Sequence, residues 1–145
     1  MKRALYIEFD GIDTPPFYSY EKFNRWVDII AEHYGKRVGK LSFIYCNDDK
    51  ILEVNNQFLS HNYYTDIITF DYCRRDILNG DIYISIDTVK SNSELFGTTF
   101  EEEFNRVFCH GILHLIGFKD KSDEDSIIMR GEEENCLQLL NLVGV

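Results

Sequence analysis

A helix that carries two histidines on one face is the strongest structural signal in this sequence. Thr99, followed three residues later by Glu102, forms a capping box, which predicts that a helix begins at about residue 100. Apolar residues then recur with helical spacing, and Gly117 predicts that the helix ends there. The apolar positions of the predicted helix are Phe104, Val107, Phe108, Ile112 and Leu115.

The two histidines of this helix, His110 and His114, lie four residues apart. A bare pair at this spacing is more often a surface feature, but the residues that follow favour a shared metal ion. Gly117 lets the chain turn back, and Asp120 follows at a distance that suits a third ligand. Three protein ligands leave one position for water, as in catalytic zinc sites. We therefore predict a metal site formed by His110, His114 and Asp120, with His114 also a candidate catalytic residue.

The spacing of these residues matches the zinc-binding string of metzincin peptidases, H-E-x-x-H-x-x-G-x-x-H. Gly111 stands where that string has the glutamate that takes a proton from water. The pattern therefore predicts a metal hydrolase scaffold without the usual proteolytic base.

The rest of the chain predicts one α+β domain spanning residues 1–145, because 145 residues suit a single hydrophobic core. Strand and helix patterns alternate, which favours a small mixed sheet of about four strands packed with helices. The metal site would lie on a helix in the last third of the chain. Strands are expected near residues 4–9, 41–46, 66–72 and 80–87, and further helices near 19–34, 47–59 and from 122 onward.

Composition places this domain among soluble cytoplasmic proteins. The N-terminal apolar run is short and interrupted by acidic residues, so we expect no signal peptide, and no stretch has the length of a membrane span. The four cysteines form no CxxC pair and mostly have apolar neighbours, which predicts reduced, buried thiols.

Four blocks of the sequence resemble those of the YbeY family of bacterial endoribonucleases. Residues 110–118 (HGILHLIGF) are similar to the signature H-G-x-L-H-L-x-G-Y-D-H, and residues 64–70 (YTDIITF) to P-T-D-V-L-S-F. Residues 80–82 (GDI) resemble a strand start of the family, and Met129 with Glu133 resembles its M-x-x-x-E ending. The blocks occur in the family order over more than half of the chain.

The resemblance implies a metal-dependent endoribonuclease that is specific for single-stranded RNA. Its expected role is maturation of the 3′ end of small-subunit (16S) ribosomal RNA, together with ribosome quality control. It implies one zinc ion per chain, held at the positions of His110, His114 and Asp120. The expected partners are single-stranded RNA, ribosomal RNA and the small ribosomal subunit, without DNA or a membrane.

Two positions depart from the family pattern. Asp120 replaces a histidine, and a carboxylate makes the site harder and better suited to manganese or iron, which we do not exclude. Leu59 stands where the family motif L-N-x-x-Y-R has an arginine, so another cation has to contact phosphate if the chain is active. Arg106, one helical turn before His110, is a candidate for this catalytic role, although pairing with Glu102 or Glu103 is the commoner use of such an arginine.

Further candidates follow from the same blocks and from the charge distribution. Asp66 and Asp81 lie at expected strand starts, where each either orients a ligand histidine or caps a turn. The formal charge is −10, and residues 101–145 hold four basic and ten acidic groups. RNA is therefore expected to approach from the N-terminal half. The candidate RNA-binding residues are Lys36, Arg37 and Lys40, with Arg74 and Arg75 in a predicted loop.

Two other readings of the metal motif remain open at the level of sequence. Two histidines and one carboxylate are also the ligand set of non-haem iron oxygenases, although these usually take their ligands from separate strands. Alternatively, the metal only fixes the last two helices of a non-catalytic, ribosome-associated factor. Leu59 in place of the family arginine favours this second reading.

Overall fold

The computed structural model describes residues 2–59 and 66–144, and at its centre lies a four-stranded sheet. The strand order is β1-β2-β4-β3. β1 and β2 pair in parallel, as do β2 and β4, whereas β3 is antiparallel to β4. The strands are β1 (Ala4–Phe9), β2 (Arg37–Cys46), β3 (Ile67–Asp71) and β4 (Ile77–Ser85).

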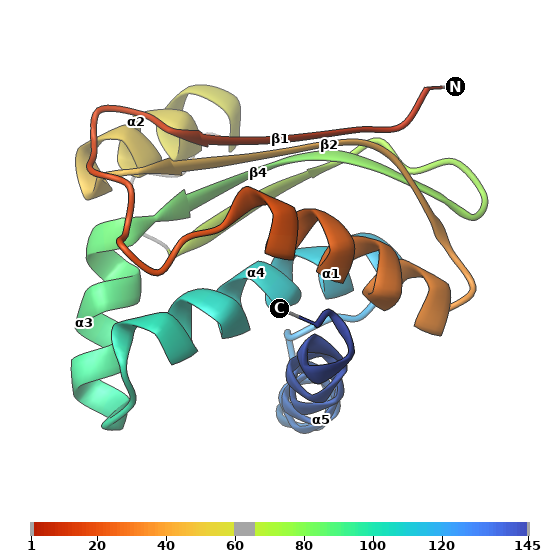
Figure 1. Cartoon of the computed structure of the whole chain (residues 1–145). Coiled ribbons are helices and arrows are strands. Elements are labelled where there is room, and N and C mark those ends of the chain that lie inside the picture. The colour runs from red at the N-terminus through yellow and green to blue at the C-terminus, as the bar shows by residue number, and fades with distance from the viewer. Residues whose placement is uncertain (1, 60–65, 145) are drawn as a thin grey trace.

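Helices cover the two faces of this sheet unequally. Figure 1 shows α1, α3, α4 and α5 on one side of the sheet and α2 on the other. The helices are α1 (Tyr20–His33), α2 (Asp48–Leu59), α3 (Ile86–Phe96), α4 (Phe100–Ile116) and α5 (Asp123–Leu139), followed by a 3-10 turn at Leu140–Leu142. This arrangement confirms the predicted α+β fold with a small mixed sheet.

The main hydrophobic core lies between the sheet and the helices α1 and α4. The rings of Trp26 in α1 and Phe43 in β2 both stack with the ring of Phe108 in α4, with centroid distances of 5.4 and 4.4 Å. All three side chains are buried, so α4 is held against the sheet along its apolar stripe. A second, smaller core under α2 contains Cys46, Ile51, Val54 and Ile68.

Two strands begin earlier than their sequence patterns indicate. β2 starts at Arg37 instead of residue 41, and β4 starts at Ile77 instead of residue 80. The extra residues of one strand pair with those of the other, Arg37 with Ile77 and Val38 with Leu78. Pairing partners 40 residues away therefore extend segments whose local composition is polar or glycine-containing.

The sequence predicts no helix at the position of α3, because the alternation of apolar and polar residues that predicts the strand of residues 80–87 extends to Asp87. The chain instead enters a helix at Ile86, and the Ser85 hydroxyl accepts a hydrogen bond from the Thr88 backbone N–H at 3.2 Å. Both hydroxyls, of Ser85 and Thr88, donate to the carboxylate of Asp48 at the start of α2. This contact between distant segments fixes the helix start.

The buried face of α5 includes a charged residue. Ile128 is half exposed, whereas Met129, Glu133 and Cys136 are buried. α5 packs mainly on α4, and a carboxylate on its inner face contacts partners on that helix. The interface between α4 and α5 therefore contains a buried acidic residue, Glu133.

The remaining expectations concern thiols and membrane spans. Cys46, Cys109 and Cys136 are buried and free, and Cys73 is half-buried and free, which agrees with the prediction of reduced thiols. Among the helices of the described residues, none combines the length and the apolar character needed to span a membrane.

Candidate metal centre

Local sequence signals at both ends of α4 place the two histidines and the chain that follows them. At the N-terminus, Thr99 and Glu102 form both hydrogen bonds of the capping box, each 3.1 Å long. At the C-terminus, Gly117 has a φ of 125°, which L-residues with a side chain rarely adopt. The backbone N–H of Phe118 donates to the carbonyl of Leu113 at 3.0 Å, so the chain turns back over the last turn of the helix.

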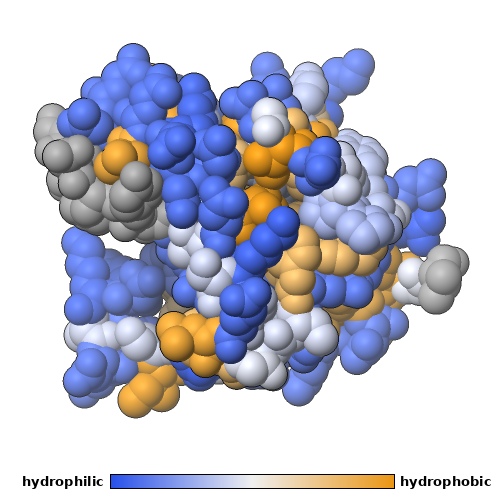
Figure 2. Space-filling model, turned by 90° about the vertical axis from the view of Figure 1, so that its left-hand side faces the viewer, coloured by the Kyte–Doolittle hydropathy of each residue, from blue (hydrophilic) through white to orange (hydrophobic). Residues whose placement is uncertain are grey.

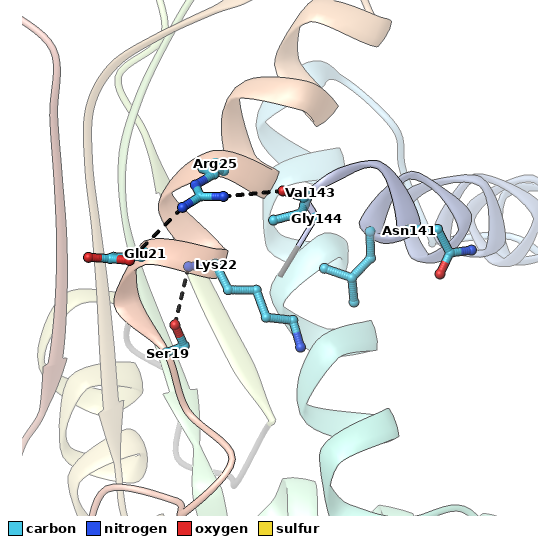
Figure 3. A pocket seen from close by; sticks show the side chains of 8 residues that line it. Ser19, Glu21, Lys22, Arg25, Asn141, Val143 and Gly144 are labelled. Carbon is cyan, nitrogen blue, oxygen red and sulfur yellow. Dashed lines mark hydrogen bonds and ion pairs between the residues drawn. The ribbon is translucent and has the colours of Figure 1, made fainter.

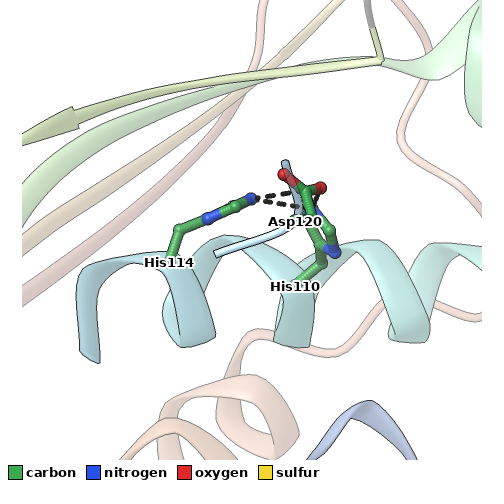
Figure 4. Close-up of side chains that lie close together, drawn as sticks. All are labelled: His110, His114 and Asp120. Atoms are coloured by element: carbon green, nitrogen blue, oxygen red, sulfur yellow. Dashed lines mark hydrogen bonds and ion pairs between the residues drawn. The ribbon is translucent and has the colours of Figure 1, made fainter. Parts of the chain in front are cut away.

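The turn brings the three predicted ligands together. Nε2 of His110 lies 2.9 Å from Nε2 of His114 and 3.2 Å from Oδ2 of Asp120. Nε2 of His114 lies 3.6 Å from the same carboxylate oxygen. Figure 4 shows both imidazoles rising from the same side of α4 and pointing toward Asp120. One potential ligand atom from each of the three residues lies within 4.8 Å of the others, which is close enough for all three to bind one metal ion.

The outer nitrogens of both imidazoles have partners of their own. Nδ1 of His114 lies 3.0 Å from the carbonyl oxygen of Phe118, and a carbonyl only accepts, so this nitrogen carries the proton. Nδ1 of His110 lies 2.7 Å from Oε2 of Glu133 and donates to that carboxylate. Both Nε2 atoms therefore present lone pairs toward each other and toward Asp120. Three acceptors that converge without a donor need a cation, so the residues fit a bound metal ion.

The electrostatics of the site favour a neutral imidazole at His114. Burial lowers the pKa of His114, and the neighbouring His110 lowers it further. The carboxylates of Asp120 and Asp66 act in the opposite direction without reversing the shift. A neutral imidazole is the form that coordinates a metal. Asp66, directly before β3, therefore lies in the electrostatic environment of the site.

Arg106 contacts carboxylates at the back of the site. It pairs with Glu103 on its own helix, and its Nη1 lies 3.0 Å from Oε2 of Glu133. The hydrogen bond to Glu103 raises the pKa of the guanidinium above its already high ordinary value. The structure thus places Arg106 behind His110, with its donors engaged by the two carboxylates.

Two other predicted residues lie on the far side of the sheet. Asp81 lines a shallow cavity of about 480 Å³ with Tyr6 and Tyr83, on the face away from α4. Strand alternation places Lys40 on the same face, since its neighbour Leu41 is fully buried under the helices. The structure therefore does not bring Asp81 to the histidines, and the hypothesis that it orients a ligand is wrong.

Gly111 faces the sheet instead of the metal ligands. A Cβ at this position would lie 3.1 Å from Cδ1 of Ile67 and 3.1 Å from Cδ1 of Ile82. The absence of a side chain allows α4 to approach the sheet closely. A base could not be placed beside His110 at this position without displacing β3 and β4.

Four of the predicted RNA-binding cations gather at one end of the sheet. Arg37 pairs with Asp76 at 3.3 Å, beside the β3–β4 hairpin that carries Arg74 and Arg75. Lys36 directly precedes Arg37, whose backbone N–H donates to the carbonyl of Asp76 in the same hairpin at 2.8 Å. Cys73 donates to the carbonyl of Leu115, 3.6 Å away, next to His114 in α4. Among the described residues, no ion pair engages Arg74 or Arg75.

Other hollows and apolar surface lie away from the metal centre. A cavity of about 510 Å³ lies between the start of α1 and the C-terminal 3-10 turn. Lys22 and Arg25 both line it, and Arg25 donates to the carbonyl of Val143 (Figure 3). Figure 2 shows the end of the molecule formed by α2 and α3, where apolar patches are separated by polar surface. Leu95 and Phe96 of α3 are among its exposed apolar side chains.

Comparison with known proteins decides the family. A family model described as Endoribonuclease YbeY matches residues 13–141. The chain belongs to the YbeY endoribonuclease family. It is 46% identical to the Endoribonuclease YbeY of Bacteroides thetaiotaomicron, over 94% of this chain and 98% of the relative. It is 49% identical to the Endoribonuclease YbeY of Phocaeicola vulgatus, over 92% of this chain and 96% of the relative. The YbeY family therefore places the chain among RNA-cleaving hydrolases.

The fold has a counterpart of known structure. The solution structure of TM1509 from Thermotoga maritima superposes with a TM-score of 0.67 at 28% identity, over 94% of this chain and 89% of that one. The resemblance to YbeY proteins inferred from four sequence blocks is confirmed. Two parts of those blocks, Tyr64 and Thr65, lie outside the described residues, as does the side chain of Leu59.

Glu133 is the residue of the centre to which sequence reasoning assigned no role. It is buried, with 3% of its surface exposed, and binds both His110 and Arg106. Burial opposes its ionisation, but the hydrogen bond from His110 and the charge of Arg106 outweigh burial and lower its pKa. The available signal was the M-x-x-x-E block, because Glu133 occupies a position of α5 that otherwise carries core residues.

Proposed function

We propose that this chain is a metal-dependent endoribonuclease specific for single-stranded RNA, with zinc as its metal. The observation that carries the proposal is the convergence of His110, His114 and Asp120, each held with its free acceptor toward the others. Membership of the YbeY family supplies the substrate class. The carboxylate of Asp120 also suits manganese or iron, which are the alternative metals.

The residues of the centre have separate roles in this proposal. His110, His114 and Asp120 would hold the ion, which supplies Lewis-acid polarisation of the scissile phosphate and a lowered pKa for bound water. Phe118, through its carbonyl, keeps the proton of His114 on Nδ1, and Glu133 does the same for His110. Residue 111 is a glycine packed against the sheet, so this position supplies no general base to accept a proton from water.

The cations at the end of the sheet support an approach path for RNA. Lys36, Arg37, Arg74 and Arg75 come from two segments that meet beside the C-terminal end of α4. Phosphate groups of a bound strand would contact these side chains while the scissile bond lies at the ligands. Lys40 projects from the other face of the sheet and is proposed only as a weaker, distant contact.

The biological role follows from the family resemblance. We propose maturation of the 3′ end of 16S ribosomal RNA and ribosome quality control, in the cytoplasm, with the small ribosomal subunit as partner. DNA is not expected as a substrate.

Cleavage of single-stranded RNA by a His114→Ala variant tests the proposal. Loss of a ligand should reduce cleavage by at least about 100-fold. His33→Ala is the matched control, since His33 is exposed at the end of α1. A parallel mock purification that cuts no RNA excludes contaminating nucleases. With that control clean, cleavage by His114→Ala at the wild-type rate would refute metal catalysis.

A structural role for the metal is the second candidate. Leu59 in place of the family arginine favours it, as does the link that His110 and Glu133 make between α4 and α5. If chelation unfolds the protein and the metal-loaded form cuts no RNA, the structural role is correct.

A further inference from the structure

A chain of four charged or polar groups runs from the metal ligands into the interface between α4 and α5. His110 donates to Glu133, and Glu133 accepts two hydrogen bonds from Nη1 of Arg106, at 3.2 and 3.0 Å. Arg106 also pairs with Glu103, one turn earlier on α4. Both glutamates are buried, Glu103 with 2% and Glu133 with 3% of the residue surface exposed.

Such a buried charged network stabilises the contact between two helices less than apolar packing would. Moving a carboxylate out of water costs several kcal/mol, and a buried ion pair seldom repays that cost against an apolar contact of equal size. Here two buried carboxylates share one guanidinium, so the cluster carries an excess negative charge. Packing alone therefore does not account for Glu133, whereas its contact with His110 does.

We propose that Glu133 is a positioning residue for the metal centre, held in place by Arg106 and Glu103. Its carboxylate fixes the ring of His110 and keeps the ring proton on Nδ1, so that Nε2 is free to coordinate. A carboxylate behind an imidazole also makes the imidazole a stronger donor to a metal. The two histidines are therefore not equivalent, since His114 has only the neutral carbonyl of Phe118 behind it.

The role of Arg106 changes with this assignment. Its guanidinium holds Glu133 toward His110, while Glu103 fixes the guanidinium from the other side. Arg106 thus acts on the metal centre through Glu133, instead of contacting a phosphate as its position in the sequence suggested.

The affinity of purified variants for Zn²⁺ tests this assignment. Glu133→Gln keeps an oxygen that accepts from His110 but removes the charge, and Glu133→Ala removes both. Glu134→Gln, an exposed neighbour on the same helix, is the matched control. Competition against a chelator of known affinity should show binding weakened about 10- to 100-fold in Glu133→Gln, more in Glu133→Ala, and unchanged in Glu134→Gln.

Two further readouts separate positioning from general stability. The absorption bands of bound Co²⁺ should shift in Glu133→Gln, because the ligand field at His110 changes, and remain constant in Glu134→Gln. Thermal unfolding of the metal-free proteins measures the structural contribution alone. If Glu133→Gln lowers the metal-free Tm but binds Zn²⁺ as tightly as Glu134→Gln, Glu133 is structural and the proposal is overturned.

These measurements do not depend on RNA cleavage. The proposal rests on the metal centre of the proposed function but not on its substrate. Weakened Zn²⁺ binding by Glu133→Gln would support the positioning role of Glu133 even if the wild-type protein cut no RNA. A wild-type protein that binds Zn²⁺ but cuts no RNA would refute only the proposed ribonuclease activity. A wild-type protein that binds no divalent metal would overturn both.

Discussion

Replacing Gly111 with glutamate would put the missing general base at its place in the metzincin string, and the structure predicts that the protein will not tolerate it. The Cβ of the new side chain would meet Cδ1 of Ile67 and two carbons of Ile82, all at 3.1 Å. These contacts are tighter than ordinary van der Waals contact. The remaining atoms, including the carboxylate, would have to enter the interface between α4 and the sheet.

The magnitude follows from two costs. Overpacking a filled interface costs about 1–3 kcal/mol. Burying a carboxylate without a partner costs several kcal/mol more, whether it remains charged or takes up a proton. A loss of about 4 kcal/mol or more is comparable to the whole stability of a small domain, about 5–15 kcal/mol. Gly111→Glu should therefore be largely unfolded or strongly destabilised.

Urea unfolding followed by circular dichroism measures this loss, with Gly131→Glu as the control. Gly131 lies on the exposed face of α5, where a Cβ meets no atom within 4 Å. The control adds the same charge and should change the free energy of unfolding by less than about 1 kcal/mol. If both variants unfold at the wild-type urea concentration, position 111 is not packed against the sheet and the explanation for the missing base is incorrect.

Three further predictions concern the hairpin, the third ligand and the metal. Arg75 has a φ of 55°, a backbone conformation that glycine adopts more easily, so Arg75→Gly should raise the free energy of unfolding by about 1 kcal/mol. The same variant loses a cation and should bind single-stranded RNA more weakly at low salt. Unchanged RNA affinity would show that this hairpin is not part of the approach path. Asp120→His should raise the ratio of Zn²⁺ to Mn²⁺ affinity in competition titrations, because nitrogen replaces a harder oxygen donor, and a constant ratio would indicate that Asp120 does not coordinate. Removing zinc held at 100 times its Kd should lower the free energy of unfolding by about 2.7 kcal/mol and the Tm by about 5–10 °C, whereas an identical Tm with and without chelator would argue against a bound ion.

Local interactions made much of the site predictable from sequence. The capping box, the histidine spacing, the glycine that ends α4 and the carboxylate three residues later all act within 22 consecutive residues. Because a helix has a fixed period and a left-handed turn favours glycine, these residues determine where the three ligands meet. The three predicted ligands His110, His114 and Asp120 therefore lie close together in the structure.

Residues that act across elements were not predictable in this way. Asp66 and Asp81 both lie at expected strand starts, but Asp81 lines the face of the sheet away from α4, whereas the charge of Asp66 acts on His114. The start of α3 depends on Asp48, which lies 37 residues before Ser85. A contact at that separation is not encoded in local spacing.

The sequence by itself determined the family, the helix that carries both histidines and the three groups that converge at its end. Only the tertiary structure decided what supports them. Packing of α5 on α4 brings Glu133 to His110, 23 residues away, and engages Arg106 there instead of leaving it for RNA. The physical reason is that ligand spacing is set by the geometry of one helix, whereas the protonation and orientation of the ligands are set by charges that reach them from another.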